Sequence, residues 1–147
     1  MNNQSMSISK QLSMNDSGET GGHQAGILIP KSEEILNFFP KLDNSQKNPR
    51  VTMYFTDKSG KTWKLNFIYY NNRFFGGTRN EYRLTGMTAY LRESNLKAGD
   101  DVILTRSNNQ LSIDCRRENA PATQELITDG QKRTVLVLGG GWKVIDY

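Results

Sequence analysis

The sequence contains few of the residues from which catalytic centres are usually built. One histidine, His23, and one cysteine, Cys115, occur among 147 residues, and the chain has no Asp-x-Lys or Glu-x-Lys triplet. Metal-dependent nucleases need acidic ligands with a nearby lysine, and zinc sites need clustered cysteine or histidine. The one dense glycine run, residues 139–141, lacks the lysine and hydroxyl of a phosphate-binding loop. The sequence therefore predicts no catalytic residue, no metal ligand and no cofactor.

Long hydrophobic runs and cysteine pairs are also missing. No segment reaches the roughly 18–20 apolar residues of a membrane span, and the first residues lack the pattern of a signal peptide. A single cysteine cannot form an internal disulfide, which favours a reducing compartment. The length suits one domain with a proper core. We expect a soluble, cytoplasmic protein in which residues 1–147 form a single domain without membrane contact.

The charge of the chain has a mild positive bias. There are 19 lysines and arginines against 15 carboxylates, which gives a formal charge of +4 and a pI near 9.2. Eight of the cations lie between residues 50 and 92 without forming a run. A basic surface for a polyanion must therefore be assembled by folding.

Hydrophobic alternation predicts a chain dominated by strands. Its β-rich segments lie at residues 7–12, 25–30, 51–56, 61–70, 102–106, 111–116, 134–138 and 142–145. Short helices are expected after Ser32, as N-cap, and over residues 85–91. No βαβ alternation occurs, so we expect a mainly β barrel or half-barrel with two short helices. Residues 57–60 predict a hairpin turn, whereas residues 118–130 are expected to form a loop.

Two details of this pattern concern which side chains face the core. In residues 7–12, Ile8 and Leu12 are expected to face inward while the serines and Gln11 face solvent, and Lys10 does not fit a strict alternation. Trp63 and Trp142 are assigned to the core. Tyr69, Tyr70, Phe74 and Phe75 are expected mainly in the core, with stacking on nucleic-acid bases as the alternative.

The most informative stretch is N-N-R-F-F-G-G-T-R-N-E-Y-R, residues 71–83. If its last five residues are extended, Arg79, Glu81 and Arg83 project to one side at intervals of about 6.5–7 Å. An arginine fork matches guanine O6 and N7, and a carboxylate accepts a hydrogen bond from cytosine N4. This pattern is typical of major-groove readout at a G- and C-rich site. A ladder of salt bridges on a solvated strand is the alternative.

The glycine-rich loop at residues 13–24 is a second candidate region, because loops of this length in compact domains are often functional, with a plain surface hairpin loop as the alternative. His23 follows two glycines and is interpreted as a loop donor to a phosphate or base, with structural and catalytic roles as alternatives. Lys10 and Arg73 are candidates for phosphate contacts, although a solvated charge explains each of them equally well.

Two segments together resemble a known family. The stretches K-Q-L-S-M-N-D-S-G-E-T-G-G-H-Q-A-G-I-L-I-P, residues 10–30, and Y-Y-N-N-R-F-F-G-G-T-R-N-E-Y-R-L-T, residues 69–85, are similar to the signatures of the N-terminal effector DNA-binding domain of EcoRII-type restriction endonucleases. The resemblance implies a seven-stranded open DNA-binding pseudobarrel with a helix at each end, shared with plant B3-type transcription factors. It also implies a bacterial, cytoplasmic location.

The family grips double-stranded DNA in the major groove with two arms, and the resemblance places these arms on this sequence. Residues 10–24 become the N-arm and residues 70–83 the C-arm. The expected DNA-binding residues are Lys10, Asn15, Asp16, Thr20 and His23 in the N-arm, and Arg73, Thr78, Arg79, Asn80, Glu81, Tyr82 and Arg83 in the C-arm. Arg79, Glu81 and Arg83 fall on base-reading positions, and the implied target is a 5′-CCWGG-type site.

The resemblance also implies a context for the domain. The chain is expected to be a monomeric, non-enzymatic effector domain from a larger type IIE endonuclease whose C-terminal nuclease domain is its partner, with DNA bound here licensing cleavage elsewhere. A stand-alone DNA-binding domain is the alternative within this class. From other classes, a small nuclease predicts magnesium-dependent cleavage, and a protein- or carbohydrate-binding β module predicts binding with little salt dependence.

Overall fold

The described residues form one curled sheet of nine strands. The computed structural model describes residues 5–17, 26–117, 134–137 and 141–146. The strands are β1 (Ser5–Gln11), β2 (Ile27–Ile29), β3 (Arg50–Thr56), β4 (Thr62–Tyr70), β5 (Glu81–Thr85), β6 (Asp101–Ser107), β7 (Gln110–Arg116), β8 (Thr134–Val137) and β9 (Trp142–Asp146). Four short helices accompany them: α1 (Met14–Ser17), α2 (Glu33–Leu36), the 3₁₀ turn η1 (Asn72–Phe75) and α3 (Thr88–Glu93). Within these residues no helix is long and apolar enough to cross a membrane.

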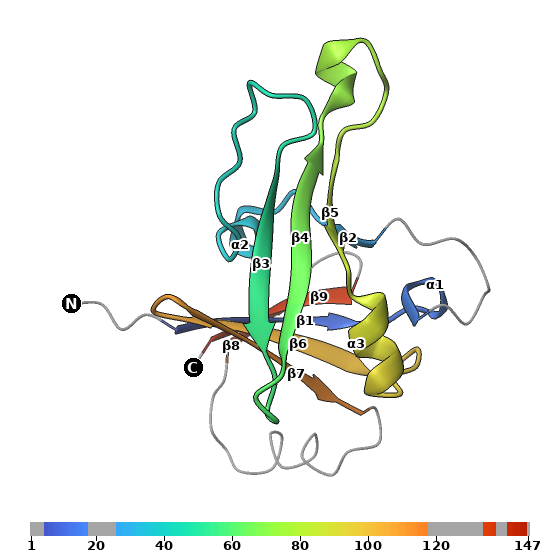
Figure 1. The fold of residues 1–147 in the computed structure, drawn as a ribbon, viewed down its shortest axis with the longest axis vertical. Helices are drawn as coiled ribbons and strands as arrows, with labels where there is room; N and C mark the ends of the chain where they lie inside the picture. Colours follow the sequence, from blue (N-terminus) through green and yellow to red (C-terminus); the bar gives the residue numbers. More distant parts are fainter. Residues whose placement is uncertain (1–4, 18–25, 118–133, 138–140, 147) are drawn as a thin grey trace.

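The strand order is β2-β5-β4-β3-β7-β6-β1-β9-β8. A short parallel contact between β3 and β7, at Thr56 and Ser112, joins two antiparallel halves. Figure 1 shows β3, β4 and β5 standing upright, with η1 at their free end, while β1, β6 and β7 run across at the level of the lower parts of β3 and β4. The Trp142 indole of β9 donates a 2.9 Å hydrogen bond to the Leu28 carbonyl of β2, which ties strands from the two halves together.

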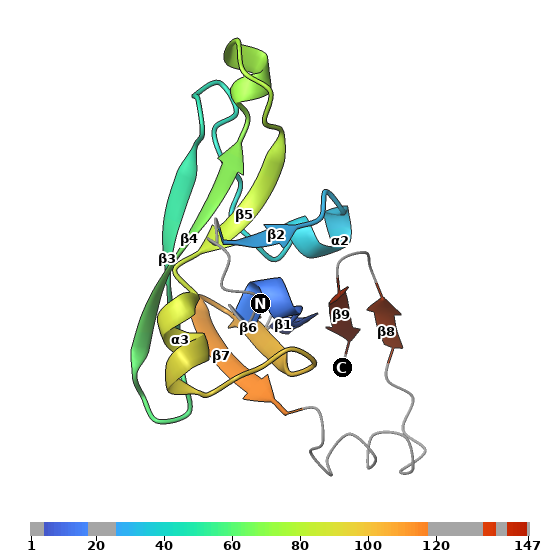
Figure 2. The ribbon, with the colours of Figure 1, turned by 90° about the vertical axis from the view of Figure 1, so that its right-hand side faces the viewer.

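The mainly β, open-barrel prediction is confirmed, with nine described strands in place of seven. Seven is the number that the resemblance implied; the eight segments predicted from alternation all contain strands, and the ninth is β5, which was treated as extended only conditionally. Strand β1 pairs on both sides, with β6 and with β9, and the β8–β9 hairpin continues the sheet beyond it. In Figure 2 this hairpin lies on the opposite side of the molecule from β3. Residues 118–130, expected as a loop, and residue 138, expected in the strand at 134–138, lie outside the described residues.

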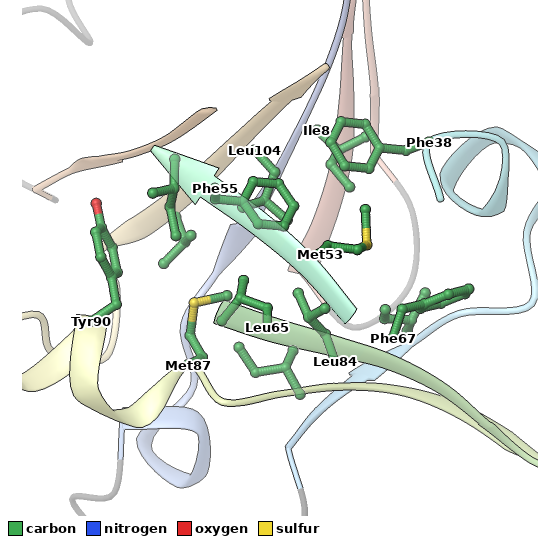
Figure 3. Close-up of a cluster of buried hydrophobic side chains, with 14 of the residues drawn as sticks. Ile8, Phe38, Met53, Phe55, Leu65, Phe67, Leu84, Met87, Tyr90 and Leu104 are labelled. Atoms are coloured by element: carbon green, nitrogen blue, oxygen red, sulfur yellow. The ribbon is translucent and has the colours of Figure 1, made fainter. Parts of the chain in front are cut away.

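The core lies inside the curl, where the two halves face each other (Figure 3). Trp63, Leu65 and Phe67 of β4 alternate inward as predicted, and Trp142 is buried as well. They pack with Ile8, Phe55, Leu84 and Leu104 from other strands and with Phe38, Phe39, Met87, Tyr90 and Leu91 from the helical segments. Because neighbouring strands present alternate residues to the same side, this cluster fixes the outward side of β5 as well.

Strand β1 departs from the prediction on its outward side. Ser7 and Ser9 are buried, not solvent-facing, because β1 is flanked by β6 and β9. The Ser7 hydroxyl pairs with the hydroxyl of Thr105 on β6 at 2.9 Å. Lys10 does fit the alternation, because its side chain lies on the same side of β1 as Ile8. It is buried, and its ammonium lies 3.1 Å from the Asp16 carboxylate.

Helix α1 was not predicted, because residues 13–24 were interpreted as a turn-rich loop. Its first turn is a reciprocal capping box: the Asp16 amide donates to the Ser13 hydroxyl oxygen at 3.1 Å, and the Ser13 amide donates to the Asp16 carboxylate at 3.0 Å. The Ser-x-x-Asp pattern that produces it is visible in the sequence. Asp16 therefore serves both the cap and the ion pair with Lys10.

The other helices are shorter or shifted relative to the prediction. The Ser32 hydroxyl donates to the Glu34 carboxylate at 2.7 Å instead of accepting from a backbone amide. Helix α3 begins at Thr88, because residue 85 still belongs to β5. Gly86 separates strand β5 from helix α3. Its φ of +92° favours glycine, and a Cβ there would lie 2.8 Å from the Lys64 carbonyl oxygen.

The predicted turn at residues 57–60 closes the β3–β4 hairpin, with the Gly60 amide donating to the Asp57 carbonyl at 3.0 Å. The Asp57 carboxylate accepts hydrogen bonds from the Ser59 hydroxyl at 2.6 Å and from the Trp63 indole at 2.9 Å. The amides of Ser59 and Lys61 donate to it as well. These donors lower the pKa of Asp57 from its usual 3.8 to about 2, with the Ser59 hydroxyl as the largest cause.

This lowered pKa predicts how the hairpin responds to acid. Because the folded-state pKa lies below the unfolded value, the stability that Asp57 contributes is fully present above pH 3.8 and is lost as the pH falls through about 2. Carboxyl NMR titration should give a midpoint near 2 for Asp57, and Ser59→Ala should move the midpoint upward. A midpoint near 3.8 in the unsubstituted chain would contradict the hydrogen-bonded turn.

Candidate nucleic-acid interface

Strand β5 carries Glu81 and Arg83 on the side opposite the core. Its register places Glu81 beside Tyr70 and Arg83 beside Ile68 of β4, while Leu84 points inward with Phe67. Arg79 comes just before the strand, where its amide donates to the Asn72 side-chain oxygen at 2.6 Å. The hairpin register therefore delivers the predicted Arg-x-Glu-x-Arg triplet to one side of the sheet.

The three side chains are in direct contact through one carboxylate oxygen. Glu81 Oε2 accepts from Arg79 Nη2 at 2.9 Å and from Arg83 Nε at 2.6 Å. The side chains retain exposures of 39% for Arg79, 29% for Glu81 and 23% for Arg83. The salt-bridge ladder considered from the sequence is thus real, yet each group keeps an accessible part with which to meet a ligand.

The charges of this cluster are fixed at neutral pH. The hydrogen bond from Arg79 is the largest cause that lowers the pKa of Glu81, partial burial opposes it, and Arg83 lowers it further. Glu81 is therefore an ionised acceptor between two cations, and the cluster carries a net charge of +1. Such a row offers donor forks on either side of an acceptor, which complements the guanine acceptors and the cytosine donor that G·C base pairs present in a major groove.

Both arginine side chains also contact other groups of the protein. The guanidinium carbon of Arg79 lies 3.8 Å from the centre of the Tyr70 ring, a cation–π contact. Arg83 Nη1 donates to the Gly26 carbonyl at 2.9 Å. Gly26 has a φ of +96°, and a Cβ there would lie 2.7 Å from Thr85 Cγ2 and 2.8 Å from the Leu84 carbonyl oxygen. Only glycine brings the chain this close, so the start of β2 is tied to Arg83.

A column of stacked rings supports the inward side of the same hairpin. Phe39 stacks on Phe67 at 4.4 Å between ring centroids, Phe67 faces Tyr82 at 5.6 Å, and Tyr82 stacks on Tyr69 at 4.2 Å. Burial raises the pKa of Tyr82. The Tyr69 hydroxyl then donates to the Asn80 side-chain oxygen at 2.6 Å. Tyr82 and Asn80 thus have contacts within the protein, and their DNA contacts stay a prediction.

The remaining C-arm candidates lie at its free end. Arg73, which lies within η1, and Thr78, which follows the two glycines of the turn, are both exposed. The Arg73 amide donates to the Arg79 carbonyl at 2.9 Å, which closes the turn at its base. Arg73 is thus placed near the triplet along the chain and projects into solvent.

The N-arm candidates are only partly described. Lys10 and Asp16 form their ion pair at the wall of a cavity of about 490 Å³ that Leu28 and Trp142 also line. Asn15 is exposed on α1. Thr20 and His23 lie outside the described residues, so their roles stay predictions.

Two contributors to the interface were missed in the sequence and a third was misplaced. Tyr70 was expected mainly in the core, yet it is only half-buried, faces outward and supports Arg79, as the alternation that turns Tyr69 inward implies. Gly26 binds Arg83 from 57 residues away, and no local signal predicts that pairing. Arg50 shares the outward side, because it pairs with Ile68, which pairs in turn with Arg83. Among the described residues, no three His, Cys, Asp or Glu side chains cluster to hold a metal ion.

Comparison with known proteins identifies relatives of two kinds. The type II restriction enzyme EcoRII of Escherichia coli is 43% identical over 79 residues, which cover 52% of this chain and 19% of that enzyme. Auxin response factor 10 of Arabidopsis thaliana is 32% identical over 114 residues, 76% of this chain and 15% of the plant protein. The B3 domain-containing transcription factor RAV1 of the same plant is 35% identical over 86 residues, 57% of this chain and 23% of its length.

The chain thus spans less than a quarter of each of these relatives. The family described as "Restriction endonuclease EcoRII, N-terminal" matches residues 1–114. This range contains both signature stretches, and the resemblance inferred from them is confirmed. Because the match covers more than half of the sequence, the chain belongs to the EcoRII N-terminal family of B3-like DNA-binding domains.

Proposed function

We propose that this domain binds double-stranded DNA sequence-specifically in the major groove. The observation that carries the proposal is the Glu81 carboxylate held between two guanidinium groups on the outward side of a projecting hairpin. Arg79 and Arg83 supply donors for guanine O6 and N7, and Glu81 accepts from cytosine N4. Two guanines and one cytosine suit a 5′-CCWGG-type site, which is the target we propose.

Phosphate contacts position the domain and base contacts select the sequence. We assign the positioning to both arms, with Arg79, Glu81 and Arg83 as the readers. The supporting residues of the proposal are Lys10, Asn15, Asp16, Thr20, His23, Arg73, Thr78, Asn80 and Tyr82. Arg73 has the clearest structural support among them, because its side chain is exposed on the same arm as the triplet.

The role that fits this binding is that of an effector domain. Since a type II restriction enzyme shares 43% identity over part of its length, we propose that the chain works beside a C-terminal nuclease domain in a bacterial cytoplasm. The domain itself binds as a monomer and performs no chemistry. DNA bound here regulates cleavage at the nuclease domain.

Binding of a labelled CCWGG duplex and of a scrambled duplex tests this function. We expect a preference of about tenfold or more for the cognate duplex, together with a steep loss of affinity between about 50 and 200 mM salt. Equal affinity for both duplexes would remove the base-reading assignment. No binding of either duplex would favour a protein- or carbohydrate-binding module, whose binding depends little on salt, and magnesium-dependent cutting by this chain would make it a nuclease.

A further inference from the structure

The tip of the β4–β5 hairpin exposes two large aromatic side chains. Phe74 and Phe75, both in η1, are 67% and 44% exposed. The sequence favoured core positions for both rings, and the structure contradicts this, because η1 stands at the free end of the hairpin beyond the sheet (Figure 1). Two adjacent exposed phenyl rings are costly in water and are typical of a contact surface.

The backbone beneath the rings is built by two asparagines. The buried Asn71 side chain accepts from the Asn48 amide at 2.6 Å and donates to the Gln46 carbonyl at 2.9 Å. Asn72 accepts from the Gly77 amide through its backbone carbonyl at 2.7 Å and from the Arg79 amide through its side chain. Gly76, with a φ of +90°, completes the turn. The rings are therefore presented by a turn that is already ordered, which lowers the entropy lost on binding.

The surroundings of the tip are positively charged. The hydrogen bonds of Asn71 join the hairpin to the segment at residues 44–50. This segment and residues 71–80 together contain Lys47, Arg50, Arg73 and Arg79, while the flanking carboxylates are Asp43 and Glu81, of which Glu81 is paired with Arg79, so the cations are in excess. A cationic surface around apolar rings complements a partner that is anionic and also offers apolar faces. Duplex DNA combines phosphates with deoxyribose and base faces in this way.

The turn keeps the rings close to the base-reading side chains. Phe75 lies four residues before Arg79, and even a fully extended chain of that length would span only about 13 Å. The hydrogen bond from the Arg73 amide to the Arg79 carbonyl folds the chain back, so the rings lie well within that distance of the first base-reading position. Since a major groove is about 12 Å wide, rings at this place are within reach of the sugar–phosphate wall that borders it.

We propose that Phe74 and Phe75 form an apolar DNA contact that packs on the deoxyriboses flanking the recognised base pairs. The contact rests on the proposed DNA binding and adds a second component to it. It contributes affinity without reading sequence, and because it removes no counterions its contribution does not depend on salt.

Binding of two cognate duplexes by the double variant Phe74→Ser/Phe75→Ser tests this contact. One duplex has about ten base pairs on each side of the site, about one helical turn, and the other is trimmed to the site. We expect the variant to lose about five- to tenfold in affinity on the long duplex and less than about twofold on the trimmed one, with an unchanged salt slope. Tyr54→Ser is the matched control, because Tyr54 is 58% exposed on β3, away from the arm.

The outcomes separate this contact from the proposed function. A double variant that binds the long duplex as tightly as the unsubstituted chain would overturn the contact. The exposed rings would then be assigned to a protein partner. An equal loss on both duplexes would also overturn it, because the loss would then come from a displaced triplet. If the unsubstituted chain bound neither duplex, the proposed function would fail, and the tip contact with it.

Discussion

Replacing Arg83 with alanine is expected to remove most of the preference for the cognate site. We expect a loss of about 1–3 kcal/mol in binding free energy on the CCWGG duplex and little change on a scrambled duplex. Arg83 is the least exposed member of the triplet, and it donates to Glu81 at 2.6 Å and to the Gly26 carbonyl at 2.9 Å. Its removal takes away a base donor and loosens the carboxylate that positions Arg79.

Arg83→Lys and Arg92→Ala make this experiment specific. Lysine keeps the charge but not the planar fork, so Arg83→Lys should lose cognate preference nearly as far as alanine does. Arg92→Ala removes one positive charge from an exposed position on α3. It should weaken the affinity for both duplexes slightly and by the same factor. If Arg83→Ala weakened cognate and scrambled binding by the same factor, Arg83 would hold a phosphate and not a base.

The triplet was predictable because a strand imposes a period of two. Once residues 61–70 were recognised as an alternating strand and residues 81–83 as extended, Glu81 and Arg83 had to share one side. The hydrophobic side chains of β4 then decide which side faces the core, which leaves the charged side outward. The same reasoning gave the mainly β class, because alternation and turn residues are local properties of the chain.

Features that depend on distant contacts were not predictable in this way. Ser7 is polar and alternates with Ile8, so it was expected to face solvent, yet the flanking strands β6 and β9 bury it. Phe74 is apolar and was expected in the core, yet the fold carries it to the tip of the hairpin. The contact between Gly26 and Arg83 needs the pairing of β2 with β5, and register between distant strands is a tertiary property.

Helix α1 is a different case, because the capping signal that predicts it is present in the local sequence. Glycines dominate residues 13–24, so the whole segment was interpreted as a turn-rich loop. Its first four residues nevertheless contain Ser-x-x-Asp, and both hydrogen bonds of a capping box form. In this segment the local capping signal therefore outweighs the overall glycine-rich composition.

The largest effect on stability is expected for Phe67→Ala. Phe67 is buried in β4 between the rings of Phe39 and Tyr82, with centroid distances of 4.4 and 5.6 Å. Removing a buried phenyl ring costs about 3–5 kcal/mol of unfolding free energy, because the transfer free energy is lost and a cavity remains. Urea or thermal unfolding measures this cost. Tyr54→Ala, at an exposed ring of β3, should change stability by no more than about 0.5 kcal/mol.

The same substitution should reach the DNA interface, because the column of rings continues from Phe67 through Tyr82 to Tyr69 and, by the Tyr69 hydroxyl, to Asn80. Asn80 lies between Arg79 and Glu81, so a cavity at Phe67 removes support directly behind the triplet. Under conditions in which the Phe67→Ala chain remains folded, we expect weaker cognate binding with a smaller preference over scrambled DNA. Phe55→Ala provides the comparison: Phe55 is also fully buried but stacks on Phe38, which meets the column only edge-on at Phe39 and, among the ring pairs of the described residues, does not contact Tyr82 or Tyr69. If both variants lost stability and bound DNA alike, the column would stabilise the core without positioning the arm.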